Sequence, residues 1–582
     1  NRSLKKVIFE DTEETLSHLS NIGGNEFREN QLTEVEIPAS VQAIEDSAFG
    51  NNQISKLVIE NNEGKSSQLK NLSGFHGNQL TEITIPNGVQ TISGFNNNQI
   101  ASLQIPSSVT TIGDNAFSEN KITNFEISSN ITTIGMNAFS GNPITEIIIP
   151  NTVKKLGSRA FCGVKKAVIE IENIPDQLFY CYNATSYPEI ILQDTVKTIG
   201  SSAFSYTKLT NLSIPISVTS IDQYAFSYAT IENLTVPNIN GSINSNAFSG
   251  TEINNLIIGM ESIPSNIFDQ KSIAKLTLLD SVKNIREAAF NTNKLTEIVI
   301  PSNVITIEDN AFNGNQISKL TIENTEEKPS QLKYLSGFSN NQITEVTIPN
   351  SVTSINNSAF LGNQLNEVNI PELVTSIGEN AFALNQITQL VIPNKVSTIG
   401  IYAFNGNRLT DLTIPNNVES IAYGAFNSNL LSDLTFDDSE DNPSQLKSIS
   451  GFESNQLTEI KIPASVQTVS GFSSNQISNL IFEDTSNKPS QLKKLSGFGD
   501  NQLTSVKIPS SVTTIDNHAF WNNQLTNVII PSSVITIDFE AFSSNQISSL
   551  TFENTEEKPS QLKKLSGFGD NQLTSVKIPS SV

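Results

Sequence analysis

The stretch LNEVNIPELVTSIGENAFALNQ, residues 365–386, is followed at once by a second version of itself, ITQLVIPNKVSTIGIYAFNGNR, residues 387–408. With conservative replacements, the two share the frame L-x-x-V-x-I-P-x-x-V-x-x-I-x-x-x-A-F-x-x-N-x, and further copies begin at Leu409 and Leu431. A fixed period of 22 residues over many copies is the signature of a solenoid. The sequence therefore predicts an array of stacked turns, which we call rungs, instead of several globular domains.

Each copy of the frame has a strand-like first part and an irregular second part. Val368 and Ile370 alternate with polar residues, which predicts a short strand with one buried face. Pro371 ends this strand, because proline has no N–H to donate to a neighbouring strand. The other apolar positions keep no helical period, so we expect them on the inner side of a turn or of a short 3₁₀ or α piece. These positions are Val374, Ile377, Ala381 and Phe382.

Stacking is what allows such rungs to form a core, since one rung cannot bury its own apolar residues. We expect the strands of successive rungs to pair in parallel, and each phenylalanine to lie on the one before it. Asn385 follows Phe382 by three residues, and a buried asparagine is costly unless its amide is hydrogen-bonded. Backbone groups of the neighbouring turn are the natural partners, which predicts an asparagine ladder. Adjacent copies place Asn363, Asn407 and Asn429 at the same position.

The repeat extends over the whole chain of 582 residues. About 26 rungs start between Leu4 and Leu573; most have 22 residues, and others have 20 or 26. The predicted fold class is a right-handed repeat solenoid with one short parallel strand per rung and little regular helix. We expect residues 1–582 to form a single array with an irregular middle at 161–290. Both ends look truncated, because we find no atypical capping repeat.

Composition and motifs exclude several classes of function. The formal net charge of −23 argues against binding DNA or RNA. The sequence contains no run of about 18 apolar residues, so it predicts no segment that inserts into a membrane. His18, His76 and His518 lie on distant rungs, and no P-loop, zinc-ligand spacing or G-x-S-x-G motif is found. We therefore expect no enzyme activity, no catalytic residue, no metal and no cofactor.

The stretch from 161 to 290 departs most from the frame, and six of the nine tyrosines fall in it. Tyr206 and Tyr228 each follow the rung phenylalanine by two residues, so they should stack on adjacent rungs, with Tyr182 close to that column. Tyrosine combines an apolar face with a polar tip and is enriched at contact surfaces. We predict a binding surface here. The alternative is that the rings pack together over a gap in the asparagine ladder, which lacks its amide at Thr207, Ala229, Thr251 and Lys271.

Three further residues stand out. Trp521 follows Phe520 where most rungs carry Ser, Asn or Gly, so it is another candidate binding residue or else covers a neighbouring turn. Cys162 and Cys181 follow the phenylalanines of two neighbouring rungs, which brings a disulfide within geometric reach. Spacing alone does not fix a bridge, and two buried or half-buried thiols are the alternative.

The frame resembles the BspA-type leucine-rich repeat, which occurs in surface proteins of bacteria and of some parasitic protists. The residues that match are the strand and proline of LTEITIP at 80–86, ITEVTIP at 343–349 and LTDLTIP at 409–415. The last two are followed by the V-x-x-I-x-x-x-A-F turn, which is shortened to Ser93-Gly94-Phe95 after the first. The family often has Cys three residues after the Phe, where this chain has Asn, as other leucine-rich repeats do. The resemblance implies a secreted or wall-attached protein and carries over no catalytic residue.

These observations lead to a first hypothesis of a non-enzymatic cell-surface binding protein. As an adhesin or host-interaction module, it would present its repeat surface to protein or glycan ligands on host or bacterial surfaces, outside the cell. The alternative is a structural spacer or stalk that displays another domain and has no ligand of its own. A third and weaker hypothesis is an array that serves an enzyme domain outside this sequence.

Overall fold

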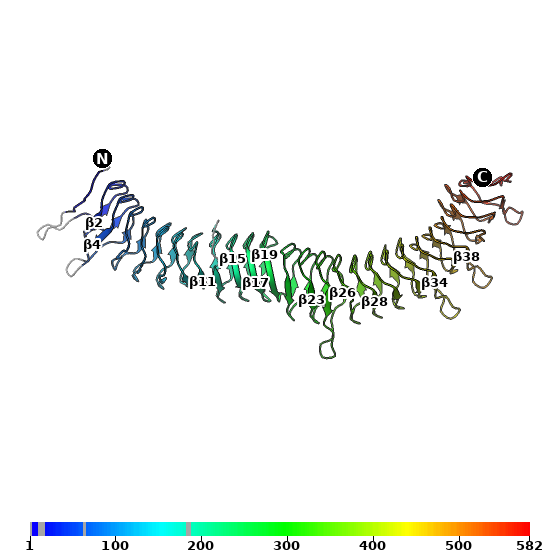
Figure 1. The fold of residues 1–582 in the computed structure, drawn as a ribbon, viewed down its shortest axis with the longest axis horizontal. Helices are drawn as coiled ribbons and strands as arrows, with labels where there is room; N and C mark the ends of the chain where they lie inside the picture. Colours follow the sequence, from blue (N-terminus) through cyan, green and yellow to red (C-terminus); the bar gives the residue numbers. More distant parts are fainter. Residues whose placement is uncertain (1–2, 10–17, 62–65, 182–187) are drawn as a thin grey trace. The chain divides into compact units, whose positions relative to one another are not determined.

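The fold is described from a computed structural model of the chain (Figure 1). The structure describes residues 3–9, 18–61, 66–181 and 188–582. Within these ranges every regular element is a short β-strand and none is a helix. All of the recorded strand pairings are parallel, and they join neighbouring rungs. The predicted repeat solenoid with little regular helix is confirmed.

By its contacts the chain divides into two compact units. Unit 1 comprises Asn1–Met260 and Gln270–Thr277, and unit 2 comprises Glu261–Asp269 and Leu278–Val582. Both are built from the same kind of rung, and each is described by itself. That residues 1–582 form one single array stays a prediction.

The rung that begins at Leu409 shows how the frame folds. Its first strand, β32 (Asp411–Ile414), alternates exposed and buried residues and ends at a proline, as predicted. A second strand follows, β33 (Ser420–Ile421), which pairs in register with the equivalent residues of the rung before it. The sequence predicted a turn or a short helical piece here, and this expectation is wrong in part. Two residues are too few to show a period in the sequence, but one side chain points out and one points in, as in any strand.

The strands of unit 1 fall into these two kinds. The two-residue strands form a seven-stranded sheet of β1 (Asn21–Ile22), β3 (Ala43–Ile44), β5 (Asn71–Leu72), β6 (Thr91–Ile92), β7 (Thr111–Ile112), β8 (Thr133–Ile134) and β10 (Lys155–Leu156), and a four-stranded sheet of β12 (Asn173–Ile174), β14 (Thr198–Ile199), β16 (Ser220–Ile221) and β18 (Ser242–Ile243). The longer strands are β2 (Glu34–Ile37), β4 (Lys56–Ile59), β9 (Glu146–Ile149), β11 (Lys166–Ile169), β13 (Glu189–Leu192), β15 (Lys208–Ser213), β17 (Thr230–Val236), β19 (Glu252–Ile258) and β21 (Lys275–Leu278).

Unit 2 repeats this arrangement with greater regularity. Its two-residue strands form one thirteen-stranded sheet of β20 (Ser262–Ile263), β22 (Asn284–Ile285), β24 (Thr306–Ile307), β26 (Tyr334–Leu335), β27 (Ser354–Ile355), β29 (Ser376–Ile377), β31 (Thr398–Ile399), β33, β35 (Ser448–Ile449), β37 (Thr468–Val469), β39 (Lys494–Leu495), β40 (Thr514–Ile515) and β42 (Thr536–Ile537). The longer strands are β23 (Glu297–Ile300), β25 (Lys319–Ile322), β28 (Glu367–Asn369), β30 (Gln389–Val391), β32, β34 (Asp433–Phe436), β36 (Glu459–Ile462), β38 (Asn479–Phe482), β41 (Asn527–Ile530) and β43 (Ser549–Phe552).

Two ladders run through the core, and both were predicted. The ring of Phe382 stacks between those of its neighbours, with centroid distances of 5.6 Å to Phe360 and 5.3 Å to Phe404. Nδ2 of Asn385 donates to the carbonyl oxygens of Phe360 at 2.8 Å and Phe382 at 3.1 Å, and its Oδ1 accepts from the N–H of Leu365 at 3.0 Å. Each asparagine thus satisfies backbone groups of two rungs, which offsets the cost of burying it.

The ladder changes in the irregular rungs of unit 1, as predicted. Thr207 donates from Oγ1 to the carbonyl of Phe204 in its own rung, whereas Thr251 donates to the carbonyl of Phe226 in the previous rung, at 2.7 Å. Ala229 has no polar side chain to offer. A hydroxyl has one donor where the amide has two, so the ladder position itself supplies fewer hydrogen bonds at Thr207, Ala229 and Thr251.

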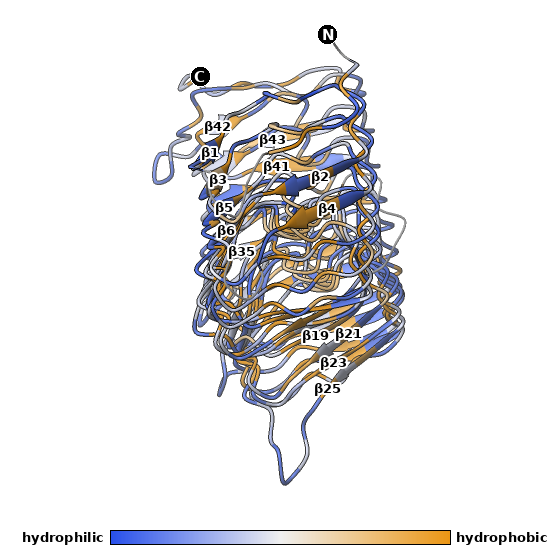
Figure 2. Ribbon diagram, turned by 90° about the vertical axis from the view of Figure 1, so that its left-hand side faces the viewer, coloured by the Kyte–Doolittle hydropathy of each residue, from blue (hydrophilic) through white to orange (hydrophobic). Residues whose placement is uncertain are grey.

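Long loops project from several rungs of unit 2 (Figure 1). The loop after β25 is coloured as hydrophilic in Figure 2, in keeping with its acidic sequence. Inside it, Oδ1 of Asn324 accepts from the N–H of Ser330 at 3.1 Å, and Oγ1 of Thr325 accepts from the N–H of Lys328 at 3.0 Å. The loop after β43 has the same two bonds, so its conformation is a repeated feature of the fold.

Candidate binding surfaces

The structure contains a column of contacting tyrosine rings in the irregular rungs. The rings of Tyr206 and Tyr228 stack with their centroids 5.1 Å apart, and Tyr180 meets Tyr206 edge-on at 5.6 Å. The guanidinium carbon of Arg159 lies 5.0 Å from the centroid of the Tyr180 ring, within the range of a cation–π contact. Tyr206 is 42% exposed and Tyr228 is 59% exposed. Tyr182, which we expected near this column, lies outside the described residues.

Backbone geometry places these rings at the surface. Tyr206 and Tyr228 have φ values of 59° and 55°, in the left-handed region that non-glycine residues seldom adopt. The equivalent residue of the next rung is Gly250, with a φ of 65°. A Cβ atom on Gly250 would lie 2.7 Å from Cδ1 of Tyr228, which is closer than atoms can approach. The glycine therefore provides the flat surface against which the Tyr228 ring lies.

A disulfide lies beside the column. Cys162 and Cys181 are joined, with their Cα atoms 5.7 Å apart, which decides between the two alternatives that the sequence left open. Cys181 and Tyr206 both line a small cavity of about 20 Å³, together with Phe179 and Thr207. The bond connects consecutive rungs where the asparagine ladder is interrupted. We expect it to stabilise the base of the tyrosine column.

Trp521 belongs to unit 2 and forms a separate cluster. The ring of His518 meets that of Trp521 edge-on at 6.1 Å and that of Phe539 at 6.0 Å. Nε2 of His518 lies 3.0 Å from Oε2 of Glu540. Trp521 is half-buried, while Phe539 is 60% exposed. Phe539 was not predicted from the sequence; it stands two residues before the A-F pair, where the rung that begins at Leu365 has Glu379.

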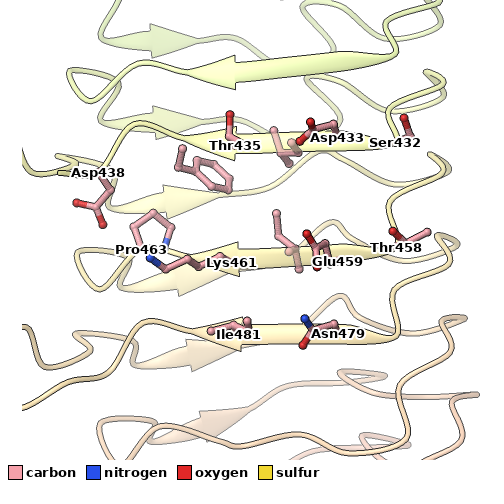
Figure 3. A pocket seen from close by; sticks show the side chains of 13 residues that line it. Ser432, Asp433, Thr435, Asp438, Thr458, Glu459, Lys461, Pro463, Asn479 and Ile481 are labelled. Atoms are coloured by element: carbon pink, nitrogen blue, oxygen red, sulfur yellow. The ribbon is translucent and has the colours of Figure 1, made fainter.

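The strand face of unit 2 carries two hollows. One, of about 680 Å³, is lined by residues of β25, β28 and β30 and of the rung that begins at Ile343. The other, of about 530 Å³, is lined by residues of β34, β36 and β38. Figure 3 shows Asp433, Glu459 and Asn479 one after another on these three strands. The hollows are formed by the outward-pointing side chains of the predicted strand face.

An ion-pair cluster borders the second hollow. Nζ of Lys488 contacts Oδ2 of Asp438 at 2.5 Å and Oε2 of Glu483 at 3.0 Å, and Nζ of Lys461 lies 2.9 Å from Oε1 of Glu483. Burial acts to raise the pKa of Glu483, but its contacts with Asp438 and with both lysines outweigh this and lower it to about 2. Burial likewise acts to lower the pKa of Lys488, and the two carboxylates raise it overall. Glu483 and Lys488 are therefore held in their charged forms at neutral pH.

Among the residues that the structure describes, no three His, Cys, Asp or Glu side chains are grouped so that they could hold a metal ion. In the same part of the chain, no helix has the length and apolar character needed to cross a bilayer. The surfaces offer stacked rings, carboxylates, amides and hydroxyls, which are groups suited to recognition.

Parallel short strands, stacked phenylalanines and an asparagine ladder in rungs of about 22 residues define a leucine-rich-repeat solenoid. A family model described as "BspA type Leucine rich repeat region (6 copies)" matches the chain in overlapping segments, and the chain belongs to that family. The segments are residues 3–120, 70–184, 162–261, 219–331, 261–383, 334–446, 381–491, 447–561 and 489–582. A search of the curated proteins finds no match.

Solved leucine-rich-repeat proteins are similar at low identity. A leucine-rich repeat protein from Bacteroides ovatus is 23% identical over 57% of this chain and 81% of its own, with a TM-score of 0.40. YopM from Yersinia enterocolitica is 17% identical over 100% of this chain and 90% of its own, with a TM-score of 0.35. A leucine rich cell surface protein from Faecalibacterium prausnitzii is 20% identical over 74% and 84%, with a TM-score of 0.20.

Proposed function

We propose that this chain is a non-enzymatic binding module displayed on the outside of a cell, an adhesin or host-interaction protein. Its specific contact surface is the tyrosine column of unit 1, formed by Tyr180, Tyr206 and Tyr228. Membership in the BspA-type repeat family supports a recognition role. The disulfide between Cys162 and Cys181 supports an oxidising compartment, since such bonds are rare in the cytosol.

The observation that carries the proposal is the exposure of a stacked tyrosine pair on rungs unlike the others. Uniform rungs present the same surface many times, which suits weak multivalent contact, whereas one distinct partner needs a distinct surface. Tyr206 and Tyr228 retain about half of their accessible surface in the free protein. Rigid tyrosines that are already stacked lose little conformational freedom on binding, and aromatic anchors commonly carry most of the binding energy.

The geometry also limits how a ligand could contact the column. The Tyr228 ring stacks on Tyr206 and lies beside Gly250, so these two contacts cover part of the ring. Tyr228 is still 59% exposed, so a partner can reach the rest of the ring and its hydroxyl group. The column therefore suits a partner that combines an apolar contact with a hydrogen bond.

The rival interpretation treats the rings as a packed cover over the interrupted asparagine ladder. A double variant separates the two: Tyr206→Ala with Tyr228→Ala. Binding of the wild-type chain and of this variant is measured on immobilised extracellular-matrix proteins and on a glycan array, and both chains are melted. Lost binding at an unchanged melting temperature supports the contact surface. A lower melting temperature, or unchanged binding to a ligand that the wild type binds, contradicts it.

Unit 2 offers a matched control. Tyr402 and Tyr423 also form a contacting pair, with centroids 5.4 Å apart, and Tyr423 is 52% exposed. Changing both to alanine removes the same chemical groups from regular rungs, so binding should persist. If the wild-type chain binds no member of either panel, the alternative function as a structural spacer is favoured.

A further inference from the structure

A row of carboxylates crosses the strand face of unit 2. The third residue of each rung points outward, and in six consecutive rungs this residue is acidic in all but one, Gln389. The five carboxylates, all exposed, are those of Glu345, Glu367, Asp411, Asp433 and Glu459. Asp411 and Asp433 are direct partners in the register of β32 and β34. Neighbouring members of the row thus stand about one strand spacing apart, ~4.8 Å.

Nothing in these rungs, all of which the structure describes, neutralises the row. In the described part of the chain, none of the five carboxylates forms an ion pair with a Lys, Arg or His nitrogen within 4 Å. The outward strand positions of the same rungs include one cationic residue, Lys461, and that side chain pairs with Glu483. Like charges directly opposite one another destabilise a sheet. We therefore expect the row to lower the free energy of unfolding of the free protein, since no ion pair of these carboxylates compensates for the repulsion.

The rest of unit 2 shows that the fold does not require this row. At the same position, the three rungs that begin at Leu503, Leu525 and Ile547 have Ser505, Asn527 and Ser549. Elsewhere on the face, the carboxylate of Glu297 stands opposite Lys319, its partner in the register of β23 and β25. The strand thus tolerates neutral residues, or a carboxylate that faces a lysine, at this position. The carboxylates without such a partner are confined to one part of the face.

The same part of the face is hollowed and carries an exposed aliphatic residue. Both hollows described above lie on these rungs, and they include four of the five carboxylates in their linings. Val391, beside Gln389 on β30, is 77% exposed. An apolar side chain left in water at the middle of a negative row is a natural contact for the apolar part of a partner.

We propose that this face, from Glu345 to Glu459, is the docking surface for an extended segment of a partner protein that carries several lysine or arginine side chains. The charge of the face selects a cationic partner, and Val391 selects one with an apolar side chain between its charges. Five strand spacings of ~4.8 Å give a row of about 24 Å, which an extended segment of about seven residues covers. The surface shares no residue with the tyrosine column, so either proposal can fail alone.

A direct test uses the full chain and a fluorescent 12-residue peptide of alternating lysine and valine. The variant Asp411→Asn with Asp433→Asn and Glu459→Gln removes three charges at nearly constant shape. We expect its affinity for the peptide to fall by at least about tenfold at low ionic strength, because close charge pairs set such affinities. We expect its melting temperature to stay unchanged or to rise. Replacing residues that stabilise the fold would lower the melting temperature. Lost binding without lost stability therefore indicates residues that serve binding.

Matched controls decide between specific and general attraction. The variant Glu326→Gln with Glu327→Gln and Glu556→Gln removes three charges from the projecting loops and should bind like the wild type. Val391→Ser alters no charge and should weaken binding several-fold. The proposal is overturned if the wild type does not bind the peptide, if the loop variant loses as much affinity as the face variant, or if Val391→Ser has no effect. Preferential binding of a glucosamine oligomer would also overturn it, in favour of a cationic glycan.

Discussion

Nζ of Lys488 lies 2.5 Å from Oδ2 of Asp438, although a complete rung separates the rungs that carry them. The loop with Lys488 leans across the short rung that begins at Leu457. The same relationship recurs between Lys328 and Asp280, 3.1 Å apart, again with one rung between. In both pairs the lysine is the twelfth residue of its rung and the aspartate is the eighth. Two of the long loops of unit 2 thus connect alternate rungs, in addition to the ladders that connect neighbours.

Replacing Lys488 should destabilise this part of unit 2. Lys488→Ala leaves Asp438, whose side chain is 7% exposed, without its counter-charge. An unpaired carboxylate in such a place costs about 1–3 kcal/mol. Hydrogen exchange of the backbone amides in the rungs that begin at Leu431 and Ile477 should become faster by the corresponding factor, with the distant rungs unaffected.

Lys558→Ala is the matched control for this change. Lys558 has the same place in an almost identical loop, but Ser510 stands where its partner aspartate would be. The local free energy of unfolding should therefore change by less than about 0.5 kcal/mol, as for most surface substitutions. Equal effects of the two substitutions would show that the loop sequence, and not the ion pair across the skipped rung, is what matters.

Acid should weaken the same cluster in a defined pH window. The pKa of Glu483 is lowered from 4.5 to about 2 in the folded chain. A lowered pKa contributes stability that is fully present above the unfolded-state pKa and is lost as the pH falls from about 4.5 towards 2. With allowance for solvent screening we expect about 1–2 kcal/mol.

The variant Glu483→Gln isolates this contribution. Its local free energy of unfolding should lie below that of the wild type at pH 6, and the difference should shrink steadily between pH 4.5 and pH 2. Amide exchange measured across this range on both chains provides the comparison. A difference that stays constant with pH would mean that Glu483 titrates normally in the folded protein.

The asparagine ladder should be costly to break, because its side chains are buried and hydrogen-bonded to the backbone. Asn385→Ala removes the acceptor of the Leu365 N–H and one of the two amide donors to each of the Phe360 and Phe382 carbonyl oxygens, at a cost of about 1–3 kcal/mol. Phe382→Ala should cost about 3–5 kcal/mol, because rigid neighbouring rungs cannot close the cavity. Local amide exchange measures both effects. Asn366→Ala, at an exposed position of the same rung, serves as the control and should be close to neutral.

Reduction of the disulfide should loosen the base of the tyrosine column. Opening the bond between Cys162 and Cys181, 19 residues apart, removes about 3 kcal/mol of stabilisation by the chain-entropy estimate for a loop of this size. Exchange of the amides of Phe179 and Tyr206 should accelerate after treatment with dithiothreitol, and the double variant Cys162→Ser with Cys181→Ser should behave in the same way. If protection at Tyr206 is unaltered in both, the bond does not support the column.

The period of the sequence was enough to determine the rung. Val368 and Ile370 on one face of a strand, the stacked position of Phe382 and the bonds of Asn385 all follow from one repeating frame, because each rung contacts mainly its neighbours and the neighbours have the same pattern. The stacking of Tyr206 on Tyr228 follows for the same reason. Their role in binding is a proposal, and Tyr182 lies outside the described residues.

Tertiary structure alone decided the features that the repeating frame does not show. A two-residue strand such as β33 leaves no periodic signal, and only pairing with its neighbours defines it. The spacing of Cys162 and Cys181 allowed a bond, but only the path of the turns between them brings the two side chains close enough to form it. The pairing of Lys488 with Asp438 depends on a loop that bends over a whole rung, and the repeating frame contains no information on that bend. A repeat specifies the contacts that every rung makes, whereas contacts made once depend on the three-dimensional course of the chain.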